Sequence, residues 1–244
     1  MAGTGVERIG RERIGTDRNG GEWTGMEGKG EERYGFFNGK EKLGEKMIKA
    51  KVKIVGIKPL LFHKFNIESL TALTKAKSGS SGNDPEEWKR SFFEKGGKLY
   101  IPGSYIFASL KNGAVNTKVG RGTIQKTWIS AVTVDEEQIF FNRKVWDGWE
   151  NMELEEVPSD ASQPVYLDIR MVSNPNTKGK NVRYRLAMSP GWEAEFNLTI
   201  DDSLISQSHA KKVIEDTGKL QGLADARTLG YGRFQVESLE FVKE

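Results

Sequence analysis

Residues 222–234, with the sequence GLADARTLGYGRF, combine residue types that suit the binding of a phosphate-bearing strand. Glycine lets a backbone approach a phosphate closely, so that amides donate hydrogen bonds to it, and an arginine guanidinium pairs with phosphate oxygens. A tyrosine ring offers a stacking face for a base. The residues that carry these roles are Gly222, Gly230, Gly232, Arg227, Arg233 and Tyr231.

The same segment also fits a tight connection between a helix and a strand, in which glycine only permits positive φ. It is not a P-loop, because no Gly-Lys-Ser/Thr follows and the segment precedes a strand rather than a helix. Both interpretations remain open from the sequence.

A second basic segment, NTKVGRGTIQKTW, contains Lys118, Arg121 and Lys126 and ends at Trp128. Cations beside an aromatic side chain are typical of a groove for single-stranded nucleic acid. The alternative is a solvated loop with Trp128 turned into the core, since tryptophan is mostly buried.

Arg183 and Arg185 alternate on a predicted strand with Tyr184 between them, so both guanidinium groups share the face opposite the tyrosine. They reach phosphates if that face is open. Otherwise they form an ordinary polar sheet surface.

His63 and Lys64 follow the first predicted strand. A histidine can deprotonate a ribose 2′-hydroxyl near neutral pH, but no acid partner is evident for His63. We therefore expect a binding or packing role for His63, and nucleic-acid binding for Lys64. No metal site or cofactor is expected, because the chain has no cysteine and only two histidines.

The balance of charge permits nucleic-acid binding without demanding it. The 244 residues include 37 Lys+Arg and 34 Asp+Glu, for a net charge of +3. No stretch approaches 18 consecutive apolar residues, and the N-terminus lacks the apolar segment of a secretory signal. We therefore expect a cytoplasmic protein that does not associate with membranes.

Residues 1–44 contain a glycine at every fifth position from Gly5 to Gly35, with eight basic and eight acidic residues among them. This period matches neither a helix nor a strand, and frequent glycine raises the entropic cost of ordering. We predict a disordered, charge-balanced tail at 1–44 and a folded domain at 45–244.

The predicted elements of the folded domain alternate in a recognisable order. Periodicity and turn residues predict a βαββαβ succession: strand 48–57, helix 104–113, strand 129–134, strands 182–200, helix 206–217 and strand 233–242. This succession indicates an α+β fold, a ferredoxin-like or RRM-like antiparallel sheet core with loop and strand insertions, and one sheet face open to a partner. Further predictions are helices at 68–75 and 85–93, a flexible stretch at 77–85, and a helix end at Gly218.

Taken together, GIKPLLFHKF, KLYIPGSYIFASLKNGA, VRYRLAMSPGWEAEFNLTI and GLADARTLGYGRF resemble the RAMP superfamily, the repeat-binding proteins of CRISPR systems. The likeness covers about residues 48–242 and is greatest to the backbone subunits that coat guide RNA, and to related RAMP-like proteins carried by phages. It implies a non-enzymatic subunit of an antiviral ribonucleoprotein that repeats along RNA as a filament.

We therefore expect a protein that binds single-stranded RNA or DNA, forms homo-oligomers and can join other subunits of a ribonucleoprotein complex. Two alternatives remain: an endoribonuclease of the same superfamily with His63 as general base, and a module that contacts only proteins. The sequence has no motif that separates RNA from DNA, because the 2′-hydroxyl contact leaves none.

Overall fold

The computed structural model describes residues 47–65, 84–173 and 179–243. The larger of its sheets has the strand order β12-β1-β11-β8-β4-β3, with β7 paired to β11, and all of its pairings are antiparallel. Its strands are β1 (Met47–Gly56), β3 (Glu94–Lys95), β4 (Lys98–Pro102), β7 (Val132–Val134), β8 (Gln138–Lys144), β11 (Glu193–Asp201) and β12 (Phe234–Lys243).

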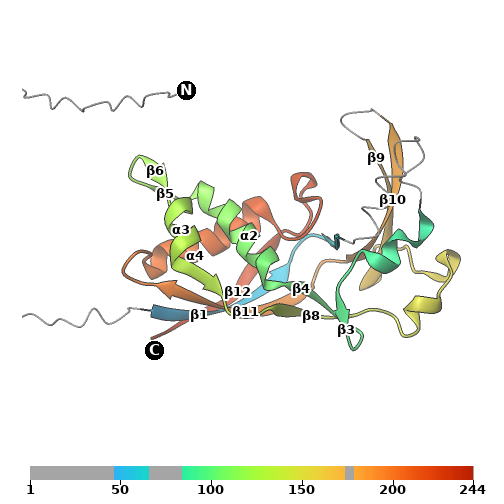
Figure 1. Ribbon diagram of the computed structural model, residues 1–244, viewed down its shortest axis with the longest axis horizontal. Helices are drawn as coiled ribbons and strands as arrows, with labels where there is room; N and C mark the ends of the chain where they lie inside the picture. The colour runs from blue at the N-terminus through green and yellow to red at the C-terminus, as the bar shows by residue number, and fades with distance from the viewer. Residues whose placement is uncertain (1–46, 66–83, 174–178, 244) are drawn as a thin grey trace, which may run out of the picture. The chain divides into compact units, whose positions relative to one another are not determined.

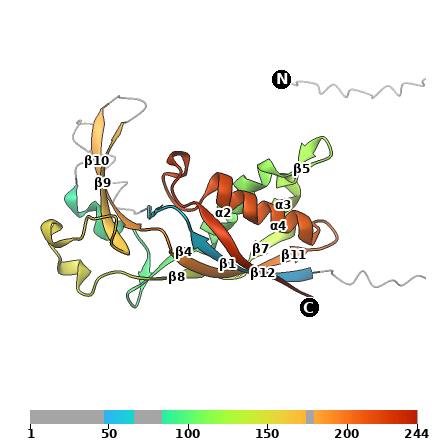
Figure 2. The ribbon, with the colours of Figure 1, turned by 180° about the vertical axis from the view of Figure 1, so that it is seen from behind.

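Helices cover one face of this sheet, and Figures 1 and 2 show them on the same side from both directions. They are α2 (Gly103–Gly113), α3 (Gln125–Ala131) and α4 (Gln207–Asp216). The chain order β1-α2-β7-β11-α4-β12 and the sheet order β12-β1-β11-β7 are those of the ferredoxin-like split βαβ motif. The predicted α+β fold with an antiparallel sheet is confirmed.

The alternation of β1 explains why this strand lies at the centre of the sheet. Ile48, Ala50, Val52 and Ile54 are buried beneath the helices, while the intervening residues face away from them. On the helical side, the hydroxyl of Ser206 accepts a hydrogen bond from the His209 amide and caps α4.

A second sheet is an insertion into this core. It has the order β2-β10-β9, with β2 (Leu60–Leu61), β10 (Lys180–Met188) and β9 (Val165–Ser173). A short hairpin joins β5 (Lys118–Val119) and β6 (Gly122–Thr123). The described residues also contain short 3₁₀ or π segments: η2 (Pro85–Arg90), η3 (Ala114–Asn116), η4 (Trp149–Asn151), η5 (Leu154–Glu156), the π-helical η6 (Thr217–Gln221) and η7 (Arg227–Leu229).

The strand predicted at 129–134 is wrong in its first half, which belongs to α3. Ile124, Trp128 and Ala131 recur at helical spacing and are buried, whereas Ile129 is 48% exposed. The strands predicted at 182–188 and 192–200 are present as β10 and β11. β10 pairs in the second sheet, whereas β11 belongs to the larger sheet.

The helix after Ser206 does not end at Gly218, because η6 continues it to Gln221. A Cβ at Gly218 would lie 2.3 Å from the carbonyl oxygen of Phe234. Glycine at this position therefore allows the close approach of β12 and is not a helix cap.

Three predictions fall wholly or mostly outside the described residues: the tail at 1–44 with its boundary, the helix at 68–75, and the stretch at 77–85. None of the helices in the described part of the chain is both long and apolar enough to cross a membrane. Over the same residues, no three His, Asp or Glu side chains are grouped closely enough to hold a metal ion.

Candidate nucleic-acid interface

The glycine-rich loop, residues 222–233, closes on itself and is attached to the segment around β2. The amide of Leu223 donates to the carbonyl of Gly232 at 2.9 Å, so the two ends of the loop meet. Asp225 and Gly232 donate their amides to the carbonyls of Leu61 and Pro59, at 3.1 and 2.7 Å. The loop is therefore held in place by main-chain hydrogen bonds.

The three glycines of this loop occupy positions with different steric constraints. All have positive φ, and a Cβ at Gly222 or Gly232 would lie 2.5 or 2.0 Å from a carbonyl oxygen of the loop itself. Glycine is therefore required at both positions for the loop to close. Gly230 has φ +85° and open space around its Cβ position, so positive φ is the reason for glycine there.

The loop cleft, a hollow of about 350 Å³, lies between the glycine-rich loop and the π-helical turn η6. Arg227 and Arg233 both line it, and neither has a carboxylate partner among the described residues. The Nη1 atom of Arg233 is buried and has no hydrogen-bond partner. The cleft is therefore lined by two cations that no carboxylate among the described residues neutralises.

Arg183 and Arg185 lie on one face of β10, as their alternation predicts, but both are already paired with carboxylates. Arg183 bonds Glu87 of η2, and its Nε donates to that carboxylate at 3.1 Å. Arg185 forms an ion pair with Asp225 of the glycine-rich loop. The two arginines therefore hold the second sheet to its neighbours, and their charges are largely neutralised.

Arg170, on β9, is a further member of this surface that the sequence does not indicate. Its guanidinium bonds Asp168 through two nitrogens and donates to the hydroxyl of Tyr231, lying 4.7 Å from the centre of that ring. The tyrosine ring is thus already in contact with a cation on one face. The alternation of Asp168 and Arg170 on a strand could have indicated the ion pair, but nothing in the sequence indicates its contact with Tyr231.

His63 lies beside the same charged groups, and Tyr105 of α2 donates its hydroxyl to the His63 carbonyl at 3.1 Å. Partial burial of the imidazole lowers the pKa of His63 below 6.5; the Asp225 charge opposes this effect, while Arg185 and Arg183 add to it. Burial therefore favours the neutral imidazole over the charged form. Burial, with a contribution from Asp225, raises the pKa of Tyr105, so its hydroxyl keeps its proton.

The basic residues Lys118, Arg121 and Lys126 are exposed, but they are not part of the loop cleft. The first two lie in the β5–β6 hairpin and the third in α3, at the end of the helices far from β9 and β10 in both views (Figures 1 and 2). Trp128 is fully buried, so it packs in the core and offers no stacking face.

The open face of the sheet carries balanced charge over its central strands. Lys53 on β1 contacts Glu193 on β11 at 3.3 Å and Glu237 on β12 at 2.6 Å, which raises the pKa of the lysine. Central strands of an RRM carry stacking aromatics on this face. Here the corresponding surface is a network of ion pairs.

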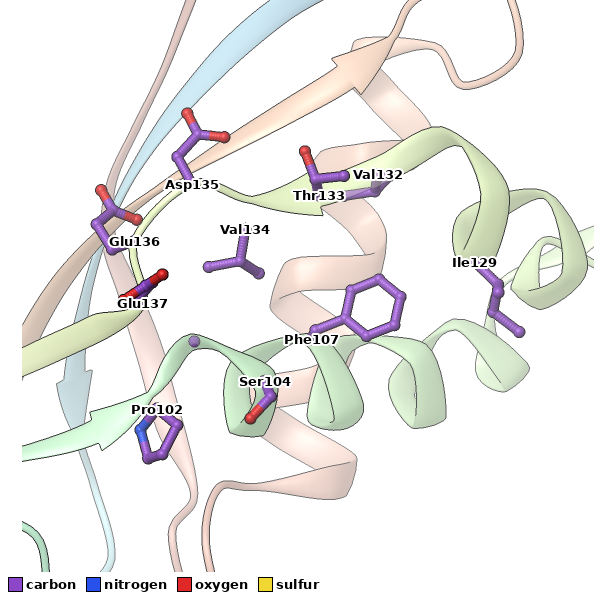
Figure 3. A pocket seen from close by; sticks show the side chains of 11 residues that line it. Pro102, Ser104, Phe107, Ile129, Val132, Thr133, Val134, Asp135, Glu136 and Glu137 are labelled. Atoms are coloured by element: carbon purple, nitrogen blue, oxygen red, sulfur yellow. The ribbon is translucent and has the colours of Figure 1, made fainter.

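A groove of about 550 Å³ lies between α2, α3 and β7 (Figure 3). Its middle is apolar, with Phe107 and Val134, whereas one end carries the carboxylates of Asp135, Glu136 and Glu137. An acidic rim repels phosphate, so this groove does not suit a nucleic acid.

The sequence matches no protein-family model and no curated protein. Among solved structures, the fold is similar to a chain in the cryo-EM structure of the Type III-B Cmr-beta bound to cognate target RNA, with 14% sequence identity and a TM-score of 0.45. The match covers 81% of this chain and 61% of that chain, so the protein spans less than two thirds of its structural neighbour.

Proposed function

We propose that this protein binds single-stranded nucleic acid, and RNA in the first instance, through the loop cleft. The observation that carries the proposal is a cleft lined by two arginines, Arg227 and Arg233, that have no carboxylate partner among the described residues. A phosphate group supplies the negative charge and the acceptor oxygens with which an arginine guanidinium pairs.

The proposal extends to a repeating, non-enzymatic subunit that coats a strand, within an antiviral ribonucleoprotein of CRISPR type. Support comes from the resemblance of the quoted segments to RAMP backbone subunits and from the ferredoxin-like strand order that this resemblance implies. Lys64 and the remote cations Lys118, Arg121 and Lys126 then extend the path of the strand beyond the cleft. Arg185, through Asp225, and Tyr231, through Arg170, hold the loop that forms the cleft to the second sheet, and Arg183 holds that sheet to η2.

Binding is tested with fluorescently labelled single-stranded RNA, single-stranded DNA and duplex of equal length, read by anisotropy. We expect the wild type to bind the single strands more tightly than the duplex, and Arg227→Ala with Arg233→Ala to weaken binding strongly. The matched control is Lys211→Ala with Lys212→Ala, which removes two exposed cations from α4 outside the cleft. Equal binding by both double variants would refute the assignment of the cleft.

An endoribonuclease is the second candidate, favoured by the grouping of His63 with Tyr105, Asp225 and Arg185. A neutral imidazole can accept the 2′-hydroxyl proton, and the protonated tyrosine could donate one. Cleavage of labelled RNA in the presence of a chelator, lost in His63→Ala, would establish this activity. Intact RNA with the wild type would exclude it.

A further inference from the structure

Three aromatic side chains form a continuous band at the end of the sheet where β8, β4 and β3 lie side by side (Figure 1). Phe140 of β8 and Tyr100 of β4 have ring centres 5.5 Å apart, and Tyr100 lies 5.6 Å from Phe93, which immediately precedes β3. These three residues are called the aromatic band below.

The band is not part of the core. On β8, Ile139 and Phe141 point toward the helices and are buried, whereas Phe140 points away from them and is 38% exposed. On β4, Leu99 and Ile101 are buried in the same way, and Tyr100 faces outward. Two of its aromatic rings therefore lie on the open face of the sheet, where they do not contribute to core packing.

Positive charge accompanies the band. Lys98 of β4 lies directly opposite Lys144 of β8, and the ammonium of Lys64 is 5.4 Å from the centre of the Phe93 ring. Like charges directly opposite one another on a sheet are destabilising. This end of the open face thus differs from its central part, where Lys53 is neutralised by two glutamates.

The band also leads toward the loop cleft. The Phe93 ring meets the Tyr105 ring edge to face at 5.7 Å, and the Tyr105 hydroxyl donates to the His63 carbonyl. His63 and Tyr105 both experience the charge of Asp225, which lines the cleft. Aromatic and charged groups therefore connect the open face with the candidate interface.

We propose that the aromatic band is a second contact for the same single strand, on which bases stack after the strand leaves the loop cleft. This inference rests on the proposed function. The ligand is an unstacked nucleobase, which RNA and DNA share, and stacking on aromatic rings tolerates any base. The adjacent lysines contact the phosphates between stacked bases.

The test compares two double variants that differ only in the retention of the rings. Tyr100→Leu with Phe140→Leu keeps apolar volume but removes both rings, whereas Tyr100→Phe with Phe140→Tyr retains them. Each is titrated with labelled single-stranded RNA and DNA, and with strands of the same length that carry abasic sites. We expect the leucine variant to bind intact strands at least about fivefold more weakly. Its salt dependence should be unchanged because no charge is altered.

The leucine variant should also lose the preference of the wild type for intact over abasic strands, while the ring-retaining variant keeps it. If the wild type binds and the leucine variant keeps the preference for intact over abasic strands, the aromatic band is not a binding site. The proposal for the loop cleft would be unaffected by that result. No binding by the wild type would refute both. Should the leucine variant fail to fold, photocrosslinking of wild-type protein to iodouridine-containing RNA is expected to modify Tyr100 or Phe140, and crosslinks confined to other residues would refute the band.

Discussion

Arg185 of β10 is ion-paired with Asp225 of the glycine-rich loop, so the second sheet holds the loop that forms the cleft. The Arg185 side chain is only 12% exposed, and its Nε atom is buried without a hydrogen-bond partner. The carboxylate of Asp225 is therefore the main counter-charge of this guanidinium. The position of the loop depends on this ion pair.

Asp225→Asn is expected to destabilise the protein by about 1 to 3 kcal/mol, because it leaves a largely buried guanidinium without its counter-charge. The free energy of unfolding in urea measures this cost. In a double-mutant cycle with Arg185→Met, the second substitution should recover part of the loss. Strictly additive effects would show that the two side chains do not interact.

Two glycines of the loop should respond very differently to alanine. Gly232→Ala places a Cβ 2.0 Å from the Leu223 carbonyl oxygen at positive φ, so a loss of about 3 kcal/mol or more is expected. Gly230→Ala meets open space and carries only the conformational cost of positive φ, about 1 kcal/mol. Thermal unfolding compares the two, and equal losses would contradict the described closure of the loop.

The sequence predicts the backbone order better than it predicts the partners of side chains. Alternation and caps locate β1, β10 and α4, but the sequence ISAVTV looks like a strand although its first half is helical. The same alternation places Arg183 and Arg185 on one face. It cannot reveal that Glu87, 96 residues from Arg183, neutralises one of them, because that contact depends on tertiary folding.

The pH dependence of His63 follows from its lowered pKa. Because the folded protein binds this proton less readily than the unfolded chain, the contribution of neutral His63 to stability is present above pH 6.5 and is lost as the pH falls below it. NMR titration of the imidazole should give a midpoint below 6.5. In Asp225→Asn the midpoint should fall further, since a charge that raises the pKa is removed. A midpoint above 6.5 would contradict the described environment.

The remote basic residues should matter only for long strands. Replacing Lys118, Arg121 and Lys126 together by alanine removes three exposed cations at the far end of the helices. Binding of a strand of about eight nucleotides should be unchanged, whereas for a strand of about thirty the salt slope should fall by about two units. Anisotropy titrations over a range of salt measure both. Equal effects on the two lengths would place these residues beside the cleft, contrary to the structure.

The central claim, that the loop cleft binds the phosphates of a single strand, is tested most directly by the salt dependence of binding in the Arg227→Ala, Arg233→Ala double variant. Each phosphate contact on a single strand contributes about 0.7 to the slope of log K against log salt concentration, so the slope should fall by about 1.4. The Lys211→Ala, Lys212→Ala control should keep the wild-type slope. An unchanged slope in the arginine variant, with wild-type affinity, would show that the strand does not bind in this cleft.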